Sequence, residues 1–176
     1  MTDRRTLYLG ISGGIIVLDQ FTKMLARQHL SDNGLIKVFG NDLVWLLYTE
    51  NPGSAFGLTL LSPFILASIS VIACIALSIY LFRRPSFDLR YNVTISMILG
   101  GAAGNMIDRV VIGRVTDFVS VDFPDFIFYR FPTFNVADSA ISVGVVIFFV
   151  STFIQDYRTH LSKRKSELPN TEYETQ

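Results

Sequence analysis

The sequence predicts a membrane protein, mainly α-helical, with four transmembrane helices and a small β-rich element on the outer face of the membrane. Half of its 176 residues are hydrophobic and only 17% are charged, with a mean hydropathy of +0.41, which is unusual for a water-soluble domain. Four apolar segments are long enough to cross a bilayer core of about 30 Å. Two longer connecting segments on one side are rich in aromatic and β-branched residues.

The second apolar segment, "LLSPFILASISVIACIALSIYLF", contains no charged residue. The first follows Arg4 and Arg5, as in a secretory signal, but no small-residue cleavage site comes after it, so we expect a retained span. Only "RRPSFDLR" separates the second and third segments, which predicts a tight turn between antiparallel helices. The chain is therefore expected to form a single integral membrane domain, residues 1–176. Its expected spans are residues 6–26, 60–82, 91–112 and 135–156, followed by a polar tail over residues 157–176.

Basic residues are distributed unevenly, and this asymmetry predicts the orientation of the bundle. Nine of the fifteen Lys and Arg residues precede the first span, join the second and third, or follow the fourth, so all nine fall on one side. Basic residues in short loops favour the cytoplasmic side, so both termini are expected there. The formal net charge of zero gives no support to a nucleic-acid partner. The nine are Arg4, Arg5, Arg83, Arg84, Arg90, Arg158, Lys163, Arg164 and Lys165.

The two outer connecting segments are too long for simple turns and too apolar for disorder. "LIKVF", "GND" and "LVWLLYTEN" predict a β-hairpin around a turn, and "FIFYRF" is a candidate third strand. Such a sheet could receive an extended peptide along an exposed edge. The alternative is an aromatic belt that only anchors the protein at the membrane interface.

Ionisable residues lie inside the expected spans. Asp19 and Lys23 are four residues apart and share a helix face, as do Asn105, Asp108 and Arg109. Each Asp or Lys at mid-membrane costs about 2.5 to 3.5 kcal/mol, so such residues usually face one another or a water-filled cavity. Structural pairing and a functional site both remain open. Small-residue spacing also favours close helix packing, at Gly10 and Gly14 and at Gly100 and Gly104.

Two further carboxyl groups reach the outer interface together. Asp117 follows the end of the third span, on an expected loop, and Asp138 lies in the first turn of the fourth span. Without a function, Asp117 would be a loop carboxylate. Asp138 would then be an anion stabilised by the helix dipole, with Asn135 as the helix N-cap.

Four motifs resemble those of the lipoprotein signal peptidase (signal peptidase II) family: "DQFTK" at 19–23, "NPGSAFG" at 51–57, "GNMIDRVVIGRVTDF" at 104–118 and "FNVADSAISVG" at 134–144. The resemblance implies a four-helix aspartic peptidase of the bacterial cytoplasmic (inner) membrane. It would remove the signal peptide from diacylglyceryl-modified prolipoproteins, cutting just before the lipid-modified cysteine. The resemblance further implies that Asp117 and Asp138 are the catalytic pair and that the outer β-element is a cradle for the substrate.

The chemistry of two neighbouring acids agrees with this resemblance. One carboxylate can take a proton from water while a neutral carboxylic acid polarises the peptide carbonyl. The helix dipole favours ionised Asp138 as the general base, which leaves the shared proton on Asp117. We expect membrane lipid as a partner, a monomer, and neither a metal nor a cofactor. The expected supporting or substrate-binding residues are Asp19, Lys23, Asn51, Gly53, Asn105, Asp108, Arg109 and Asn135.

Three other functions can be weighed against this one. A small proton- or ion-coupled transporter would need polar groups across the whole membrane, whereas the charged residues gather near one face. In a scaffold protein the acids would only stabilise the fold. Loss of enzymatic activity without unfolding would exclude this alternative. "GISGG" contains a serine-protease string, but Ser12 would lie in the cytoplasmic half, with no histidine in the spans to activate it.

Overall fold

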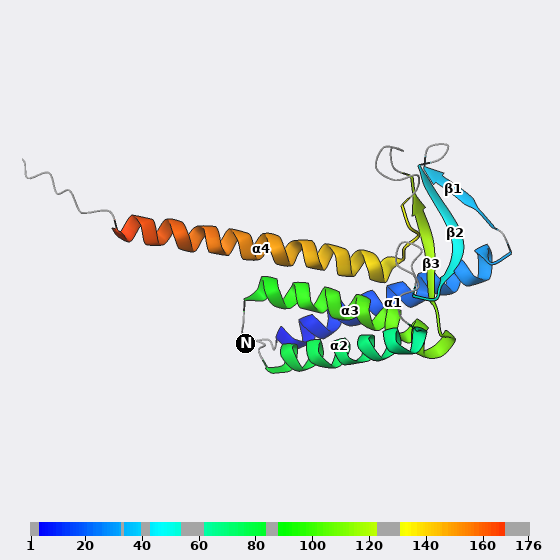
Figure 1. The fold of residues 1–176 in the computed structure, drawn as a ribbon, viewed down its shortest axis with the longest axis horizontal. Coiled ribbons are helices and arrows are strands. Elements are labelled where there is room, and N and C mark those ends of the chain that lie inside the picture. Colours follow the sequence, from blue (N-terminus) through cyan, green and yellow to red (C-terminus); the bar gives the residue numbers. More distant parts are fainter. Residues whose placement is uncertain are drawn as a thin grey trace, which may run out of the picture.

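A computed structural model describes residues 4–32, 34–39, 43–53, 62–83, 88–122 and 131–167. Four long helices lie side by side, and a three-stranded sheet stands at one end of them (Figure 1). All four helices are long and apolar enough to cross a membrane, as predicted. The elements are α1 (Arg4–Leu30), β1 (Ile36–Phe39), β2 (Val44–Asn51), α2 (Pro63–Arg83), α3 (Leu89–Ile112), β3 (Val115–Val121) and α4 (Val136–Glu167).

Helix α3 is central, because it packs against each of the other three helices. Its glycines allow this close approach. A Cβ atom on Gly101 would overlap the Ala137 carbonyl oxygen of α4, and one on Gly104 would lie 2.6 Å from Asp19 Oδ2 of α1. The expected close packing at Gly10 and Gly14 is wrong, since a Cβ at either would meet no atom within 4 Å. Those two glycines do not face the neighbouring helices.

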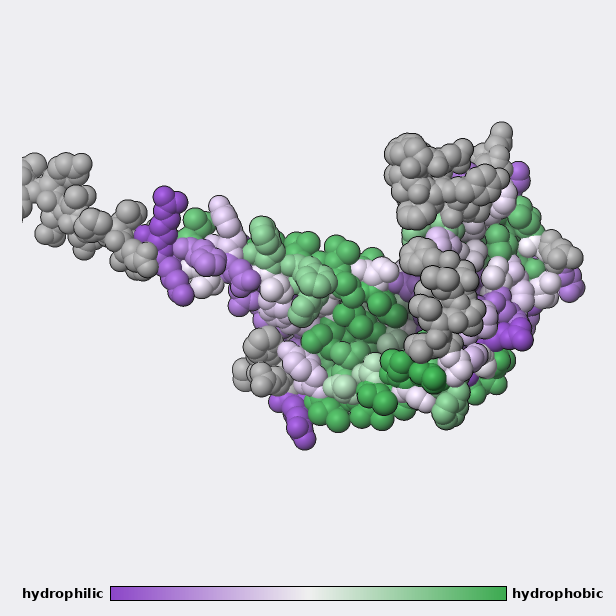
Figure 2. Space-filling view, in the orientation of Figure 1, coloured by the Kyte–Doolittle hydropathy of each residue, from purple (hydrophilic) through white to green (hydrophobic). Residues whose placement is uncertain are grey.

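The outer surface of the helices is apolar, and much of the interior is polar. Exposed large side chains such as Val17, Ile72 and Phe153 project from the helices. Figure 2 shows a hydrophobic band over the helices on one face of the molecule. Fully buried side chains include Lys23 and Asn92. This distribution suits a protein whose solvent is lipid, because polar groups there must find partners inside the protein.

The sheet has the strand order β1-β2-β3, and both pairings are antiparallel. The predicted antiparallel pairing of the first two strands is confirmed, with Lys37 opposite Trp45, and their expected turn "GND" lies outside the described residues. The third strand of this sheet is "VTDFVSV", which was not predicted as a strand. The candidate strand "FIFYRF" lies outside the described residues except for its last residue, Phe131. Gly113 ends α3 in the left-handed conformation, with φ 75°, so the chain turns back within two residues and runs beside β2. Asp117 therefore lies on a strand, opposite Thr49, and not on a loop.

Two helices extend beyond their expected ends. Helix α1 continues to Leu30, because Ala26 and Leu30 pack against Phe118 of the sheet. Helix α4 continues to Glu167, well past the expected start of the polar tail at residue 157. Its last turns contain neither Gly nor Pro up to Pro169, and Lys, Arg, Gln and Glu are good helix formers. The end of α4 thus projects beyond α3 (Figure 1).

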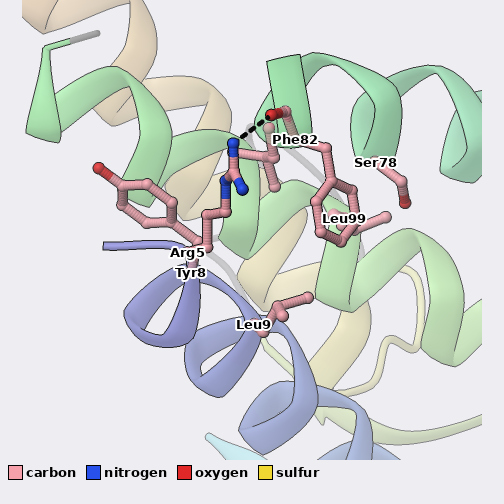
Figure 3. Close-up of a pocket in the computed structure, with 7 residues that line it drawn as sticks. Arg5, Tyr8, Leu9, Ser78, Phe82 and Leu99 are labelled. Atoms are coloured by element: carbon pink, nitrogen blue, oxygen red, sulfur yellow. Dashed lines mark hydrogen bonds between the residues drawn. The ribbon is translucent and has the colours of Figure 1, made fainter. Parts of the chain in front are cut away.

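A side-chain contact ties two helices together at the end of the bundle far from the sheet (Figure 3). Arg5 Nη2 of α1 donates a hydrogen bond to the carbonyl oxygen of Phe82, 3.3 Å away in the last turn of α2. The bond satisfies one of the carbonyl groups that a helix end leaves without a helical partner. Tyr8, Leu9 and Leu99 line the narrow pocket beside it.

Candidate active site

Asp117 is buried at the sheet end of the bundle, with only 2% of its surface exposed. Two amide side chains hold its carboxyl group. Asn135 Nδ2 donates to Oδ1 at 2.7 Å, and Asn51 Nδ2, from the end of β2, donates to Oδ2 at 3.2 Å. Each carboxyl oxygen therefore has a fixed partner from a different segment of the chain.

Asp138 lies in the first turn of α4 and is half-buried. Asn105 Nδ2 of α3 donates to its Oδ1 at 2.8 Å. The Asn135 N–H donates to Oδ2 at 3.2 Å, and the Asp138 N–H donates back to Asn135 Oδ1 at 2.9 Å. This reciprocal arrangement is a helix capping box. It confirms the predicted role of Asn135 as the N-cap of this helix.

Asn135 links the two acids. Its amide nitrogen donates to Asp117, while its amide oxygen accepts the backbone N–H of Asp138. The same amide nitrogen lies 3.1 Å from Asn105 Oδ1 and 3.2 Å from the Thr116 carbonyl oxygen. One fully buried side chain thus joins β3, α3 and the start of α4. The two acids come from separate motifs and meet around it.

The pKa of Asp117 is raised from 3.8 to about 6. Burial is the largest cause, because it disfavours the charged carboxylate, and the negative charge of Asp138 is the second. The amides of Asn51 and Asn135 oppose the shift by donating hydrogen bonds to the ionised form. Asp117 is therefore the group that holds a proton easily in mildly acidic conditions.

A buried ion cluster lies directly beneath Asn105. Lys23 Nζ is 2.8 Å from Asp19 Oδ2 and 3.1 Å from Asp108 Oδ2, and the side chains of Lys23 and Asp19 are completely buried. Lys23 Nζ also donates to Asn105 Oδ1 at 2.8 Å. Because the Asn105 oxygen faces this cation, its NH₂ group is directed at Asp138. Asn105 thus connects Lys23 to the Asp138 carboxyl group.

The three polar residues expected on one face of the third span contact two different helices. Asn105 and Asp108 both face Lys23 of α1. Arg109 turns toward α2, where its Nη1 donates to Ser70 Oγ at 3.4 Å. Lys23 and Arg27, both on α1, are the cations that pair with Asp108.

Asn51 is oriented by the turn that follows β2. The Gly53 N–H donates to Asn51 Oδ1 at 2.9 Å, which leaves the NH₂ group of Asn51 directed at Asp117. Gly53 has a φ of 108°, a conformation that glycine adopts without strain. The predicted supporting role of Gly53 thus has a physical basis in this structure.

Four residues of the site were not predicted from the sequence. Gln20 Nε2 donates to Asp19 at 3.2 Å and to Asp108 at 3.3 Å, and the Ala137 N–H donates to Asp19 Oδ1 at 2.9 Å. Arg27 pairs with Asp108 at 2.7 Å, and the Thr116 N–H donates to Asp108 Oδ2 at 3.0 Å. Gln20, Thr116 and Ala137 lie inside the quoted motifs, so their position next to predicted residues was the available signal.

Ser12 has a structural contact in the other half of the bundle. It is buried, and its hydroxyl group donates to the carbonyl oxygen of Ser96 on α3 at 2.8 Å. The "GISGG" string is therefore part of a helix–helix contact.

The helices and the site together define a multi-pass membrane protein with two carboxyl groups at one end of its bundle. The family model for signal peptidase (SPase) II matches residues 11–154. The chain belongs to this family of bacterial membrane peptidases.

Known relatives match most of this chain. It is 42% identical over 141 residues to the lipoprotein signal peptidase of Chlorobium phaeobacteroides, covering 77% of this chain and 89% of the relative. The lipoprotein signal peptidase of Caldanaerobacter subterraneus is 44% identical over 134 residues, covering 76% and 86%. A bacterial membrane enzyme solved by the in meso method at 2.3 Å superposes with a TM-score of 0.73 at 27% identity, covering 95% of this chain and 94% of its own.

Proposed function

We propose that this chain is an aspartic endopeptidase that cleaves the signal peptide from diacylglyceryl-modified prolipoproteins, just before the lipid-modified cysteine. One observation carries the proposal: Asp117 and Asp138 lie around the shared Asn135 in different environments, one buried on a strand and one at a helix N-terminus. Pairs of carboxyl groups whose surroundings favour different protonation states divide acid and base roles between them. Membership of the signal peptidase II family supports the substrate class.

In the proposed reaction, Asp138 is the general base and Asp117 is the general acid. Asp138 takes a proton from water as the water oxygen attacks the carbonyl carbon, and Asp117 gives its proton to the carbonyl oxygen. The resulting diol collapses as Asp138 returns its proton to the leaving amine and Asp117 recovers one from the diol hydroxyl. The raised pKa of Asp117, about 6, supports its role as the acid. Asp138 lies in the first turn of α4, beside the positive end of the helix dipole, a position that suits the general base.

The sheet offers a place for the extended part of the substrate. Strand β1 lies at the edge of the order β1-β2-β3, and β2 carries Asn51 toward Asp117 at its end. A peptide that adds a strand to such an edge gains main-chain hydrogen bonds. We propose that both termini are cytoplasmic and that the two acids lie near the outer face of the inner membrane.

A transporter would need buried titratable groups across the membrane, and the part of the chain that the structure describes does not have that arrangement. Among the described residues, the fully or nearly fully buried charged side chains are all at the sheet end of the bundle. They are Asp19, Lys23, Asp108 and Asp117. A proton relay requires such groups at successive depths, so this distribution favours the peptidase.

The direct test is a gel-shift cleavage assay with purified protein and a diacylglyceryl-modified prolipoprotein. We expect cleavage by the wild type, and none by Asp117→Asn or Asp138→Asn at near-wild-type melting temperature. The amide keeps the shape of the carboxyl group but cannot transfer its proton. The same prolipoprotein without its lipid serves as the substrate control and should stay uncut. Near-wild-type turnover in either variant would remove that residue from the catalytic pair.

A further inference from the structure

A polar cleft lies at the end of the bundle opposite the aspartates. Its walls are the start of α3 and one face of the last turns of α4, and its volume is about 420 Å³. Cavities of roughly 300 to 1,000 Å³ are typical of small-ligand sites. On α4, residues at positions 154, 158 and 162 and at 155, 159 and 163 repeat every four residues, so they share one face of the helix.

The lining of the cleft carries more cations than acids. Arg90, Arg158 and Lys163 line it, together with Asp88. The carboxyl group of Asp88 is directed at Arg90, because it caps the Arg90 N–H at 2.9 Å and pairs with Arg90 Nη2 at 3.1 Å. The other two cations, Arg158 and Lys163, lie on the α4 wall. The hydroxyl groups of Thr159 and Ser162 add neutral hydrogen-bonding groups to the same wall.

A contact beneath the cleft fixes its two walls relative to each other. The Tyr91 hydroxyl group of α3 donates to Gln155 Oε1 of α4 at 2.7 Å. The Tyr91 ring also packs edge-on against Phe148, with 5.6 Å between ring centroids. The cleft is thus formed by the fold itself and needs no ligand to bring α3 and α4 together.

We propose that this cleft binds the phosphate headgroup of an anionic phospholipid. The cleft opens where the apolar part of α4 gives way to its charged part: Ile154 lines the cleft, the neighbouring Phe153 is exposed on the same turn, and Arg158 lies one turn further along. An acyl chain of the lipid can lie along the apolar residues of α4 while its phosphate contacts Arg158 and Lys163. Basic groups at this level attract anionic lipid by about 1 kcal/mol each. The proposal does not depend on the peptidase mechanism.

Native mass spectrometry of the full chain in detergent, titrated with phosphatidylglycerol, tests the proposal. We expect Arg158→Gln and Lys163→Gln each to weaken phosphatidylglycerol binding about fivefold, since each removes one cation from the cleft. Arg164→Gln is the matched control: it makes the same charge change on the same helix at an exposed position that does not line the cleft. Its affinity should stay within about twofold of the wild type.

Two further arms distinguish a lipid site from general charge attraction and from a site for free phosphate. Phosphatidylcholine, whose headgroup carries the same phosphate but is zwitterionic, should bind more weakly than phosphatidylglycerol to the wild type. Inorganic phosphate at the same concentration should not displace the bound lipid, because it lacks the acyl chain. Equal losses in Arg164→Gln and Arg158→Gln would reduce the effect to general charge attraction and overturn the proposal. Displacement by inorganic phosphate would overturn the lipid assignment.

Discussion

The protonation of one buried carboxyl group should be visible in the stability of the whole protein. Asp117 has a folded-state pKa raised from 3.8 to about 6, so the folded state binds its proton more tightly than the unfolded state. Its contribution to stability is therefore fully present below about pH 4 and is lost as the pH rises through about 6. The corresponding change in the free energy of unfolding is about 2 to 3 kcal/mol.

We predict that Asp117→Asn removes this component of the pH dependence. Melting temperatures in detergent, measured between about pH 4 and 7, should fall more steeply for the wild type than for the variant. The hydrogen bonds of the new amide with Asn51 and Asn135 shift the variant's stability by an amount that does not vary with pH. Parallel curves for the two proteins would show that the carboxyl group does not titrate in this range.

Asn105 is expected to position Asp138 and to be oriented by Lys23. We predict that Asn105→Ala lowers kcat about 10- to 100-fold, the cost of one hydrogen bond to a charged group, and leaves KM within about twofold. Because Asn105 connects Lys23 to Asp138, Lys23→Met should reduce kcat much less in the Asn105→Ala background than in the wild type. Steady-state kinetics of the four proteins measure this coupling. If the double variant lost kcat by the product of the two single losses, Asn105 and Lys23 would act independently, and the positioning role would be contradicted.

That Asp117, Asp138 and Asn135 meet at one end of the bundle was predictable from the sequence, but the orientation of the amide side chains around them was not. Asp117, Asp138 and Asn135 stand in recognisable motifs. The direction of an amide depends on partners from other elements, here Lys23 for Asn105 and the Gly53 N–H for Asn51. The spacing of residues within one motif does not report which way such an amide turns.

Among the elements, α3 depends on its glycines to sit at the centre of the bundle. We predict that Gly101→Ala destabilises the protein by about 1 to 3 kcal/mol, because the added methyl group would overlap the backbone of α4 at Ala137. Gly14→Ala on α1 is the control, since its methyl group meets no atom within 4 Å. It should leave stability unchanged or raise it by up to about 1 kcal/mol through helix propensity. Melting temperatures in detergent compare the two, and an equal loss in both would contradict the close-packing account.

The four helices were predictable because a single physical requirement, the thickness of the bilayer, sets their length and composition. Four apolar segments became four helices because the bilayer requires that length. The strand "VTDFVSV" was not predictable from its local sequence, because it follows directly on α3 and carries the polar residues Thr116 and Asp117. The turn after α3 places residues 115–121 beside β2, and this pairing makes the segment a strand.

At the scale of the whole molecule, the distribution of basic residues predicts its orientation. A reporter fused at residue 87 or after residue 165 should register as cytoplasmic, and one inserted near Asn41 as external. Accessibility of single cysteines to a membrane-impermeant reagent provides an independent measurement. An external C-terminal reporter would reverse the proposed orientation and place the aspartates on the cytoplasmic side.

The buried ion cluster also has a consequence for the order in which the protein assembles during synthesis. Helix α1 carries its own counter-ion, since Asp19 and Lys23 are paired one turn apart, so it can enter the membrane first at reduced cost. Asp108 finds its cations on that earlier helix, at Lys23 and Arg27. When α3 enters the membrane, the cations that pair with its Asp108 are therefore already present on α1, because α1 is synthesised first.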